Sequence, residues 1–330
     1  MKKFFKVLKW IVLTIVVVIV VFIGYALLRS QDTFEAPYPE ITASTDSTLI
    51  ARGKYLVYGP AHCVNCHVSP SEFEKVVAGE FVPLSGGHVF ALPIGNIYVP
   101  NITSDKNTGI GSYSDRELAR LFRYGIKRNG HAALDFMPFY DVSDKDITAI
   151  ISYLRTEPAV NKSVPQNEWN FLGKIVQAFG MIKPSGDGNV PPSPEPDSTI
   201  EYGHYLAESV ANCRGCHTKR DLMTGGYAGT YYAGQMQFEA FDQDGKIIPG
   251  KHMVSPNLTP DKETGRIALW TQDVFIRRIQ AGRVIQGSPM PWEAFSKMNE
   301  SDLKAIYKFL NTLQPVHSET PAGILEGDPE

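Results

Sequence analysis

The chain has 330 residues, of which 43% are hydrophobic and 20% are charged. Five of its 32 basic residues precede the first acidic residue, Asp32, which leaves 27 basic against 35 acidic residues and a formal charge of −8 in the remainder. Nucleic-acid-binding domains present a basic face to the phosphate backbone. This charge balance therefore argues against a nucleic-acid partner.

Residues 1–29 are predicted to form a membrane anchor. Positions 10–28 are apolar apart from Thr14 and Gly24, and these 19 residues are enough to cross a bilayer core of ~30 Å. Four lysines precede the stretch, which predicts a cytoplasmic N-terminus. A cleaved signal peptide is the alternative, but its apolar region would be shorter and followed by an A-x-A-like site. We expect one uncleaved span, followed by a polar tether at residues 30–47.

Two copies of the motif C-x-x-C-H use all four cysteines of the chain: Cys63 and Cys66 before His67, and Cys213 and Cys216 before His217. This pattern is typical of c-type haem attachment, in which two thiols bond the haem vinyl groups and the histidine ligates the iron. A redox dithiol or a zinc site is the alternative. Paired zinc motifs usually lie within ~20 residues of each other, whereas the offset here is 150 residues. We therefore expect two covalently bound haem c groups.

The two motifs lie within an internal repeat. Landmarks occur in the same order in both halves: Gly53 and Gly203, Pro100 and Pro256, Thr108 and Thr264, Gly125 and Gly282, Met137 and Met290, Asp146 and Asp302. Each half has ~110 residues, a normal size for an independent core. We predict a tandem duplication, with cytochrome c domains at residues 48–160 and 200–316, a linker containing a helix at residues 161–199, and a tail at residues 317–330.

The fold is expected to be mainly α. Helices are predicted before each motif, at residues 49–57 and 200–207. Gly53 and Gly203 lie inside these helices at a cost of ~1 kcal/mol relative to alanine, which is tolerated where another backbone packs closely. Capping-box pairs predict where further helices begin: Ser114 with Glu117, Ser143 with Asp146, and Asn299 with Asp302. An apolar segment at residues 168–182 is expected to pack against a haem domain, or else to dock on a partner or a membrane surface.

Met137 and Met290 are the predicted distal iron ligands. Met137 is the one methionine between His67 and the end of the first domain near Val160, and the repeat selects Met290 from the five that follow the second motif. Both precede a proline, which favours an extended backbone, and methionine opposite histidine suits a haem that only carries electrons. The histidine alternatives have no counterpart in the other half: His88, His131 and His252.

Two kinds of loop are expected near the haems. The recurring Pro-Asn-[Ile/Leu]-Thr segments at residues 100–103 and 256–259 bond a propionate or form a turn. The glycine pairs at residues 86–87 and 225–226 are expected to be tight turns. Half two also has an insertion between Gly226 and Pro249, which either covers the haem or docks a partner.

The ordered string G-x-Y-L, C-x-x-C-H, P-N-[I/L]-T-x-D, T-G, M-P and D-[I/L] resembles the cytochrome c subunit of membrane-bound bacterial alcohol, aldehyde and sugar-acid dehydrogenases. The resemblance implies class I cytochrome c folds, with His67 and Met137 on one iron and His217 and Met290 on the other. Many relatives carry three haem domains, whereas this chain has two.

By this resemblance the chain is an electron-transfer subunit in the bacterial inner membrane, with periplasmic haem domains. It takes electrons from a dehydrogenase and passes them to a quinone or a terminal oxidase of the respiratory chain. The alternative is an enzyme, such as a dihaem peroxidase or a thiosulfate-oxidising cytochrome, which requires one iron with an open site.

Overall fold

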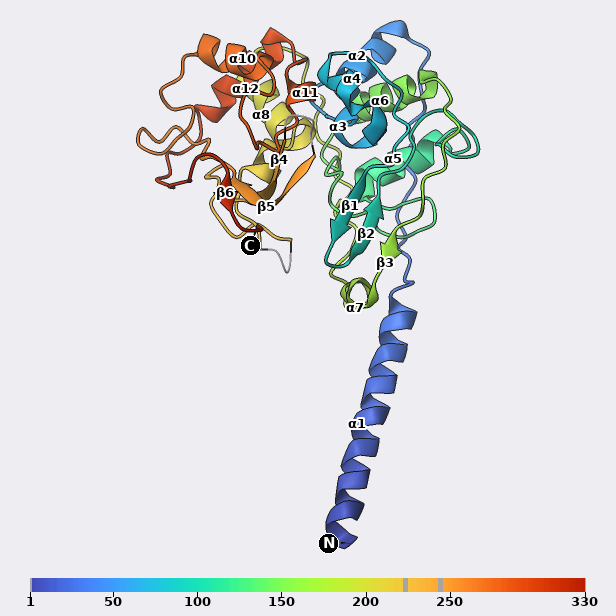
Figure 1. The fold of residues 1–330 in the computed structure, drawn as a ribbon. Helices are drawn as coiled ribbons and strands as arrows, with labels where there is room; N and C mark the ends of the chain where they lie inside the picture. The colour runs from blue at the N-terminus through green and yellow to red at the C-terminus, as the bar shows by residue number, and fades with distance from the viewer. Residues whose placement is uncertain (1, 222–224, 243–245, 330) are drawn as a thin grey trace.

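The structure is a computed structural model that describes residues 2–221, 225–242 and 246–329. Helices hold 38% of the residues and strands 10%, so the fold is mainly α, as predicted. Two lobes lie side by side, and a long N-terminal helix projects from the first of them (Figure 1).

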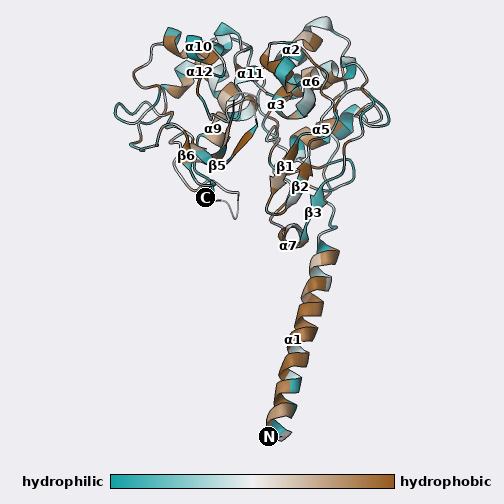
Figure 2. Cartoon of the chain, in the orientation of Figure 1, coloured by the Kyte–Doolittle hydropathy of each residue, from teal (hydrophilic) through white to brown (hydrophobic). Residues whose placement is uncertain are grey.

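The projecting helix is α1 (Lys2–Arg29), whose side chains are exposed along almost its whole length. Its segment Lys3–Arg29 has a mean hydropathy of 3.2, and among the described residues it is the one helix long and apolar enough to cross a membrane. Figure 2 shows apolar residues along nearly all of the helix. A helix that is apolar on every face needs an apolar environment, which neither lobe supplies.

The first lobe contains two long packed helices, several short ones and a small antiparallel sheet of order β1-β2-β3. Its elements are α2 (Ser47–Tyr58), α3 (Val64–His67), a 3₁₀ turn (Pro70–Glu72), α4 (Phe73–Val77), β1 (Val89–Leu92), β2 (Gly95–Tyr98), α5 (Asp115–Tyr124), α6 (Asp144–Thr156), β3 (Glu168–Trp169) and α7 (Phe171–Ala178).

The second lobe repeats this plan, with an antiparallel sheet of order β4-β5-β6. Its elements are α8 (Ile200–Tyr205), a π-helical turn (Leu206–Val210), α9 (Cys213–Cys216), β4 (Gln237–Phe241), β5 (Ile247–Val254), α10 (Gln272–Gln280), α11 (Trp292–Phe295), α12 (Glu300–Leu310) and β6 (Leu325–Glu326). The described part of the predicted insertion contributes β4 and the beginning of β5.

Close backbone contact explains the glycines inside the first helix of each lobe. A Cβ atom on Gly53 would lie 1.9 Å from the carbonyl oxygen of Ala149 in α6, and one on Gly203 would lie 2.0 Å from that of Ala305 in α12. Both distances are far below van der Waals contact, so no larger residue fits at this crossing. The expected close approach of another backbone is therefore confirmed in both lobes.

The three predicted helix starts are observed, but two of the capping boxes are incomplete, at Ser143 and at Asn299, which accepts from the N–H of Asp302 while its own N–H donates to the Tyr55 hydroxyl. Ser114 accepts a hydrogen bond from the N–H of Glu117, whose carboxylate accepts one from the N–H of Ser114, so this capping box is complete. Ser143 accepts from the N–H of Asp146, but the Asp146 carboxylate does not return to the cap. It accepts instead from Arg52 and Tyr205, because two stronger donors lie within reach.

The two lobes contact each other reciprocally. The Tyr55 hydroxyl donates to the Asp302 carboxylate at 2.7 Å, and the Tyr205 hydroxyl donates to the Asp146 carboxylate at 2.8 Å. These residues occupy matching positions of the repeat, so each lobe offers the other the same tyrosine and the same aspartate. Such an exchange is the signature of a two-fold interface. Arg52 joins it with two bonds of 2.9 Å to Asp146.

The segments before and after the first lobe pack along it. In the predicted tether, Phe34 donates its N–H to the carbonyl of Gly130, and Glu40 pairs with Arg116 at 2.6 Å. In residues 161–199, Lys162 donates to the Ser69 hydroxyl at 2.8 Å. The chain therefore leaves little slack between α1 and the first lobe.

Candidate functional site

Each C-x-x-C-H motif begins at the same strained turn. The N–H of Ala61 donates to the carbonyl of Leu56 at 2.9 Å, and His62 follows with φ of 43°. In the second lobe the N–H of Ala211 donates to Leu206 at 2.7 Å, and Asn212 has φ of 49°. Non-glycine residues rarely adopt this left-handed conformation, and it clusters at functional sites. The matching turns direct both chains into their motifs in the same way.

One helical turn then holds the two cysteines of each motif. The N–H of His67 donates to the carbonyl of Cys63 at 2.8 Å, and that of His217 donates to Cys213 at 2.9 Å. Cysteines three residues apart in such a turn lie on the same side of it. This arrangement lets both sulfurs reach one ligand that lies against the turn.

The thiols have the wrong pKa for a redox dithiol. Burial raises the pKa of Cys63 and Cys213 to about 12 and that of Cys66 to about 11. A reactive dithiol needs a lowered pKa, because the thiolate is the nucleophile. Among the described residues, no three His, Cys, Asp or Glu side chains are grouped so that they could hold a metal ion. The described part of the chain therefore offers no ligand set for a zinc site of the usual four-ligand kind.

The motif histidines have an identical partner in both lobes. His67 Nδ1 lies 2.9 Å from the carbonyl oxygen of Pro100, and His217 Nδ1 lies 2.9 Å from that of Pro256. Burial lowers the pKa of His67 to about 4 and also lowers the pKa of His217, so both rings are neutral at pH 7. A carbonyl can only accept, so Nδ1 carries the proton and Nε2 keeps its lone pair. This is the orientation and tautomer that second-shell partners give to metal-ligating histidines.

The Pro-Asn-[Ile/Leu]-Thr segments are turns held by their own side chains. Asn101 Oδ1 accepts from the N–H and the hydroxyl of Thr103 at 2.9 and 2.7 Å, and its Nδ2 donates to the carbonyl of Val160 at 2.8 Å. The same three bonds recur around Asn257, with Thr259 and Val316 as partners. The turn alternative is therefore confirmed. The turn also aims the preceding proline carbonyl at the histidine, a role that no side-chain pattern reveals.

Met137 and Met290 lie in matching turns at the edge of the core. Each is partly buried, and both pack against the apolar cluster that also receives Cys63 and Cys213. The carbonyl of Met137 accepts from the N–H of Phe139 at 2.8 Å, and that of Met290 accepts from the N–H of Trp292 at 2.7 Å. Both thioethers therefore leave the backbone from the same kind of turn.

The alternative ligands have other neighbours. His131 Nδ1 lies 3.1 Å from the carbonyl of Asp32, His252 Nδ1 lies 2.9 Å from that of Gly327, and the ring of His88 packs on Phe90 at 4.7 Å. Of the other methionines after the second motif, Met298 and Met253 are buried, and Met223 lies outside the described residues.

Sequence reasoning missed one glycine near the second motif. The N–H of Gly86 donates to the carbonyl of His67 at 2.7 Å with φ of 67°, and its counterpart is Gly234, which donates to His217 at 2.8 Å with φ of 75°. The pair at residues 225–226 does not take this place. The N–H of Gly225 donates instead to the carbonyl of Asp221. Residues inserted before Gly234 shift the register, so sequence order alone pairs the wrong glycines.

Each motif also lies against the methionine loop of the other lobe. Asn65, inside the first motif, donates to Glu293 at 2.9 Å, and Glu293 pairs with Arg283 at 2.7 Å beside Met290. In the other direction, Arg220 follows the second motif and lies 3.5 Å from Asp135, two residues before Met137. The inter-lobe contact therefore joins the functional segments of both lobes.

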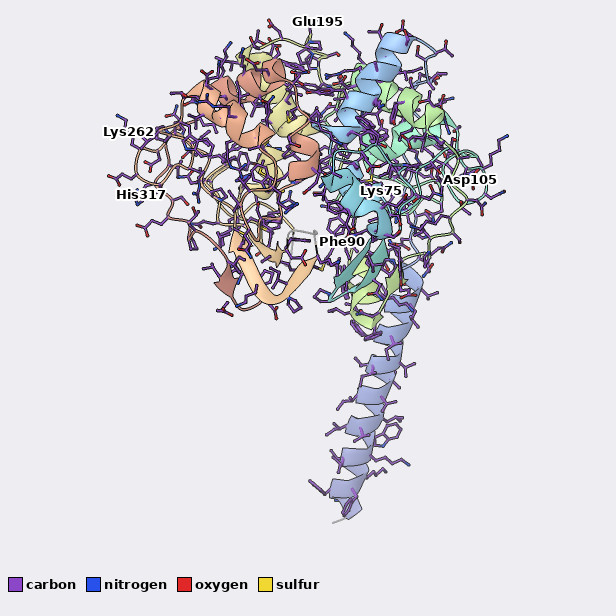
Figure 3. All side chains as sticks on the ribbon, turned by 45° about the horizontal axis from the view of Figure 1, so that its top comes forward. Lys75, Phe90, Asp105, Glu195, Lys262 and His317 are labelled. Carbon is purple, nitrogen blue, oxygen red and sulfur yellow. The ribbon has the colours of Figure 1, made fainter. Side chains whose placement is uncertain are left out.

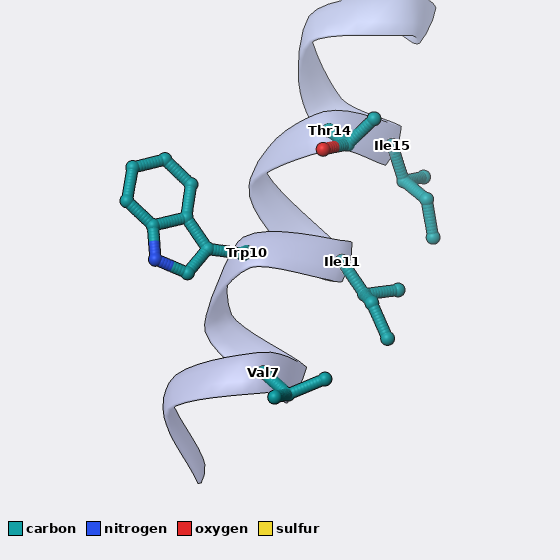
Figure 4. Close-up of a pocket in the computed structure, with 5 residues that line it drawn as sticks. All are labelled: Val7, Trp10, Ile11, Thr14 and Ile15. Carbon is teal, nitrogen blue, oxygen red and sulfur yellow. The ribbon is translucent and has the colours of Figure 1, made fainter. Parts of the chain in front are cut away.

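Two surface features lie away from the C-x-x-C-H motifs: the turns that hold Asp105 and Lys262, and a hollow on α1. Asp105 and Lys262 lie at opposite outer edges of the molecule in Figure 3, so the turns that follow the Pro-Asn segments face away from the other lobe. Figure 4 shows a hollow on α1 lined by one side of that helix: Val7, Trp10, Ile11, Thr14 and Ile15. Thr14 is its one hydroxyl-bearing residue, and the hollow has no group suited to catalysis.

No protein-family model matches the chain. It is 28% identical over 289 residues to the gluconate 2-dehydrogenase cytochrome c subunit of Pantoea cypripedii, covering 81% of this chain and 60% of that protein. It is 26% identical over 306 residues to the fructose dehydrogenase cytochrome subunit of Gluconobacter japonicus, covering 89% and 57%. A diheme cytochrome c-type of Cereibacter sphaeroides is 25% identical over 176 residues, covering 50% and 56%.

The chain spans about three-fifths of the length of the first two of these relatives. It is similar to cytochrome c subunits of bacterial dehydrogenases over most of its own length, so the resemblance carried by the motifs is confirmed. Relatives of this kind imply electron transport and covalently bound haem c.

Proposed function

We propose that this chain is a membrane-anchored dihaem cytochrome c that transfers electrons between a dehydrogenase, or a quinol-oxidising partner, and a respiratory acceptor. The observation that carries the proposal is the duplicated histidine geometry, in which a neutral ring is fixed through Nδ1 by a proline carbonyl beside two cysteines on one helical turn. On this proposal residues 48–160 and 200–316 are tandem class I cytochrome c domains.

The residues fit one haem c in each lobe. Cys63 and Cys66 would bond the porphyrin, His67 would ligate the iron through Nε2, and Met137 would supply a second iron ligand. Cys213, Cys216, His217 and Met290 would do the same in the second lobe. When bound, each haem iron carries one electron by cycling between the ferric and ferrous states.

Groups of the protein would limit the change in protonation and ligation that accompanies each electron transfer. The carbonyl of Pro100 holds the His67 ring in one tautomer, so no proton moves when the charge on the iron changes. A thioether ligand from Met137 favours the reduced state and raises the potential. The peroxidase and thiosulfate-oxidising alternatives need one lobe with an open position, and the matching turns at Met137 and Met290 favour equal ligation in both.

Volume-conserving variants test the ligand assignment. Met137→Leu and Met290→Leu remove the sulfur and change core volume little. Each should abolish about half of the methionine-to-ferric-iron charge-transfer absorption and lower the potential of one haem, with both haems still attached, because a methionine ligand raises the potential of the haem that it binds. Met298→Leu, at a buried core methionine, is the control and should change neither signal. An unchanged spectrum in both ligand variants would exclude these two methionines as ligands.

We further propose a single α1 span in a bacterial inner membrane, with a cytoplasmic N-terminus and both lobes in the periplasm. The apolar length of α1 and the lysines at its start support this orientation. Protease added to spheroplasts should then digest the lobes and leave α1 protected. Purification from native membranes should bring down a catalytic dehydrogenase subunit, since the relatives named above are subunits of such enzymes. Isolation of the chain alone from mild detergent would contradict a stable complex.

A further inference from the structure

Helix α7 and the residues after it present apolar side chains to the outside, next to the end of α1. Phe171, Leu172, Phe179 and Met181 are 43–56% exposed. One face of the segment packs on the first lobe, where Gly173 and Ala178 are buried, and these four residues lie on the exposed side. Figure 1 shows α7 at the end of the first lobe from which α1 departs.

The start of α7 is rigidly attached to the first lobe. Asn170 caps the helix by accepting from the N–H of Gly173 at 3.0 Å, and its Nδ2 donates to the carbonyl of Pro93 at 2.8 Å. A Cβ atom on Gly173 would lie 2.2 Å from the carbonyl oxygen of Ile94, so the helix lies directly on the β1–β2 turn. The lobe therefore fixes which face of α7 is buried and which is exposed.

The contact with α1 sets the depth of this segment. The ring of Phe179 lies 6.1 Å from that of Phe22 and 5.9 Å from that of Tyr25. With a helical rise of ~1.5 Å per residue, Tyr25 and Phe22 lie about 4.5 and 9 Å below Leu28, where the apolar stretch ends. If α1 spans a bilayer, the ring of Phe179 lies at the level of Phe22 and Tyr25, inside the boundary of the bilayer's hydrocarbon core. Interfacial helices bury their apolar face to a similar depth of about 5–10 Å.

The charge of the segment suits phospholipid headgroups. Between Glu168 and Asp187 the charged residues are Lys174 and Lys183, although the chain beyond α1 is acidic as a whole. Lysines that flank an apolar face are typical of helices that lie in the plane of a membrane surface. A protein partner needs no particular depth beside α1, whereas a lipid surface requires the depth that Phe179 has.

We propose that α7, together with Phe179 and Met181, is an interfacial helix that inserts into the phospholipid leaflet at the end of α1 and holds the first lobe against the membrane. The inference rests on the proposed span by α1. It adds a second attachment point, so the lobe is fixed in orientation and is not free to swing on a single helix. The reciprocal inter-lobe contacts then extend this orientation to the second lobe.

Spin labels on the full-length holo-protein test the proposal. Once the four native cysteines carry haem, a single new cysteine can be labelled in Leu172→Cys, Phe179→Cys or, as a control on the second lobe, Leu269→Cys, a residue that is 80% exposed. The protein is placed in vesicles of phosphatidylethanolamine and phosphatidylglycerol. Labels at positions 172 and 179 should collide several-fold more with oxygen, and several-fold less with a water-soluble nickel complex, than the label at position 269.

The outcomes separate this inference from the proposed anchor. If the protein floats with the vesicles and both α7 labels are as open to nickel as the control, α7 does not insert and the inference is wrong. If they become shielded only after a native membrane extract is added, α7 docks on a protein and the lipid proposal is likewise overturned. If the chain does not float at all, the proposed span by α1 fails, and with it the inference that rests on it.

Discussion

Removing one hydroxyl from each inter-lobe tyrosine should destabilise the protein to unequal extents. In Tyr205→Phe, the Asp146 carboxylate loses one donor and keeps two bonds from Arg52. In Tyr55→Phe, the Asp302 carboxylate loses the hydroxyl that donates to it at 2.7 Å, and the nearby Arg52 acts on it only through its charge, because its hydrogen bonds go to Asp146. The repeat makes the two tyrosines equivalent by position, and the single arginine makes their partners inequivalent.

The magnitudes follow from burial. Asp302 is 1% exposed, and desolvation already raises its pKa. A hydrogen bond to a charged group contributes ~1.5–3 kcal/mol to stability. A buried acceptor that loses a donor also bears the cost of desolvation that this bond had offset. We expect Tyr55→Phe to lower the free energy of unfolding by about 3 kcal/mol and Tyr205→Phe by about 1 kcal/mol. The larger figure is a sizeable part of the usual total of ~5–15 kcal/mol.

The pH dependence gives a second signature. A carboxyl whose pKa is raised in the folded state contributes less stability as pH rises above its unfolded value of 3.8. Tyr55→Phe raises the folded pKa of Asp302 further, so its deficit should be full at pH 7 and shrink as the pH approaches the unfolded value. Tyr205→Phe leaves both hydrogen bonds from Arg52 to the Asp146 carboxylate in place.

Urea unfolding of the full chain in detergent, followed by circular dichroism at several pH values, measures both effects. Tyr307→Phe is the matched control, since this hydroxyl donates to the carbonyl of Trp270 within one lobe and should cost about 1 kcal/mol at every pH. Equal losses for the two inter-lobe variants, a larger loss for Tyr205→Phe, or a Tyr55→Phe deficit that does not change with pH would refute the reasoning.

Three more results are expected. Gly53→Ala forces a methyl group into the α6 backbone and should cost at least ~1–3 kcal/mol, seen as loss of folded, haem-loaded protein. Asn101→Ala strands the N–H and hydroxyl of Thr103 in the core and should cost ~2–4 kcal/mol in a denaturant titration. The pKa of Asp105 and that of Asp261 are lowered by hydrogen bonds from the following threonines, so the stability they add is lost as pH falls below 3.8, and the protection of amides in these turns, measured against the intrinsic exchange rate at each pH, should fall there.

Controls for these results lie in the same chain. Gly24→Ala places its methyl group in open space and should leave both folding and haem loading unchanged. Asn257→Ala repeats the Asn101→Ala change in the second lobe and should cost a similar amount. A harmless Gly53→Ala, or amide protection in the Asp105 and Asp261 turns that stays constant below about pH 4, would contradict the corresponding argument.

Local sequence signals predicted the helices well, because caps and periodic apolar positions act within a few residues. The start of α5 at Ser114 follows directly from its capping box. Gly53 predicted a close helix crossing, because only a nearby backbone justifies glycine inside a helix. The cytochrome motifs and their repeat are sufficient to indicate the related proteins.

Other features depend on contacts across the fold and have no local signal. The carboxylate of Asp146 leaves its cap because Tyr205, 59 residues later, donates to it. The carbonyl of Pro100 is a backbone group, so its role on His67 is invisible in the side-chain pattern. The apolar segment of α7 has the composition of a core helix, and only its position beside α1 distinguishes an exposed face from a buried one.

The reciprocal Tyr55–Asp302 and Tyr205–Asp146 bonds make this chain a fused homodimer in its physical behaviour. The segment at residues 161–199, much of which is held against the first lobe, keeps the two halves at a mutual effective concentration on the order of millimolar, so they associate without a second molecule. The same self-complementary surfaces can also exchange partners between chains. Shortening this segment until the halves cannot meet should therefore favour a domain-swapped dimer in which the same inter-lobe bonds form between two chains.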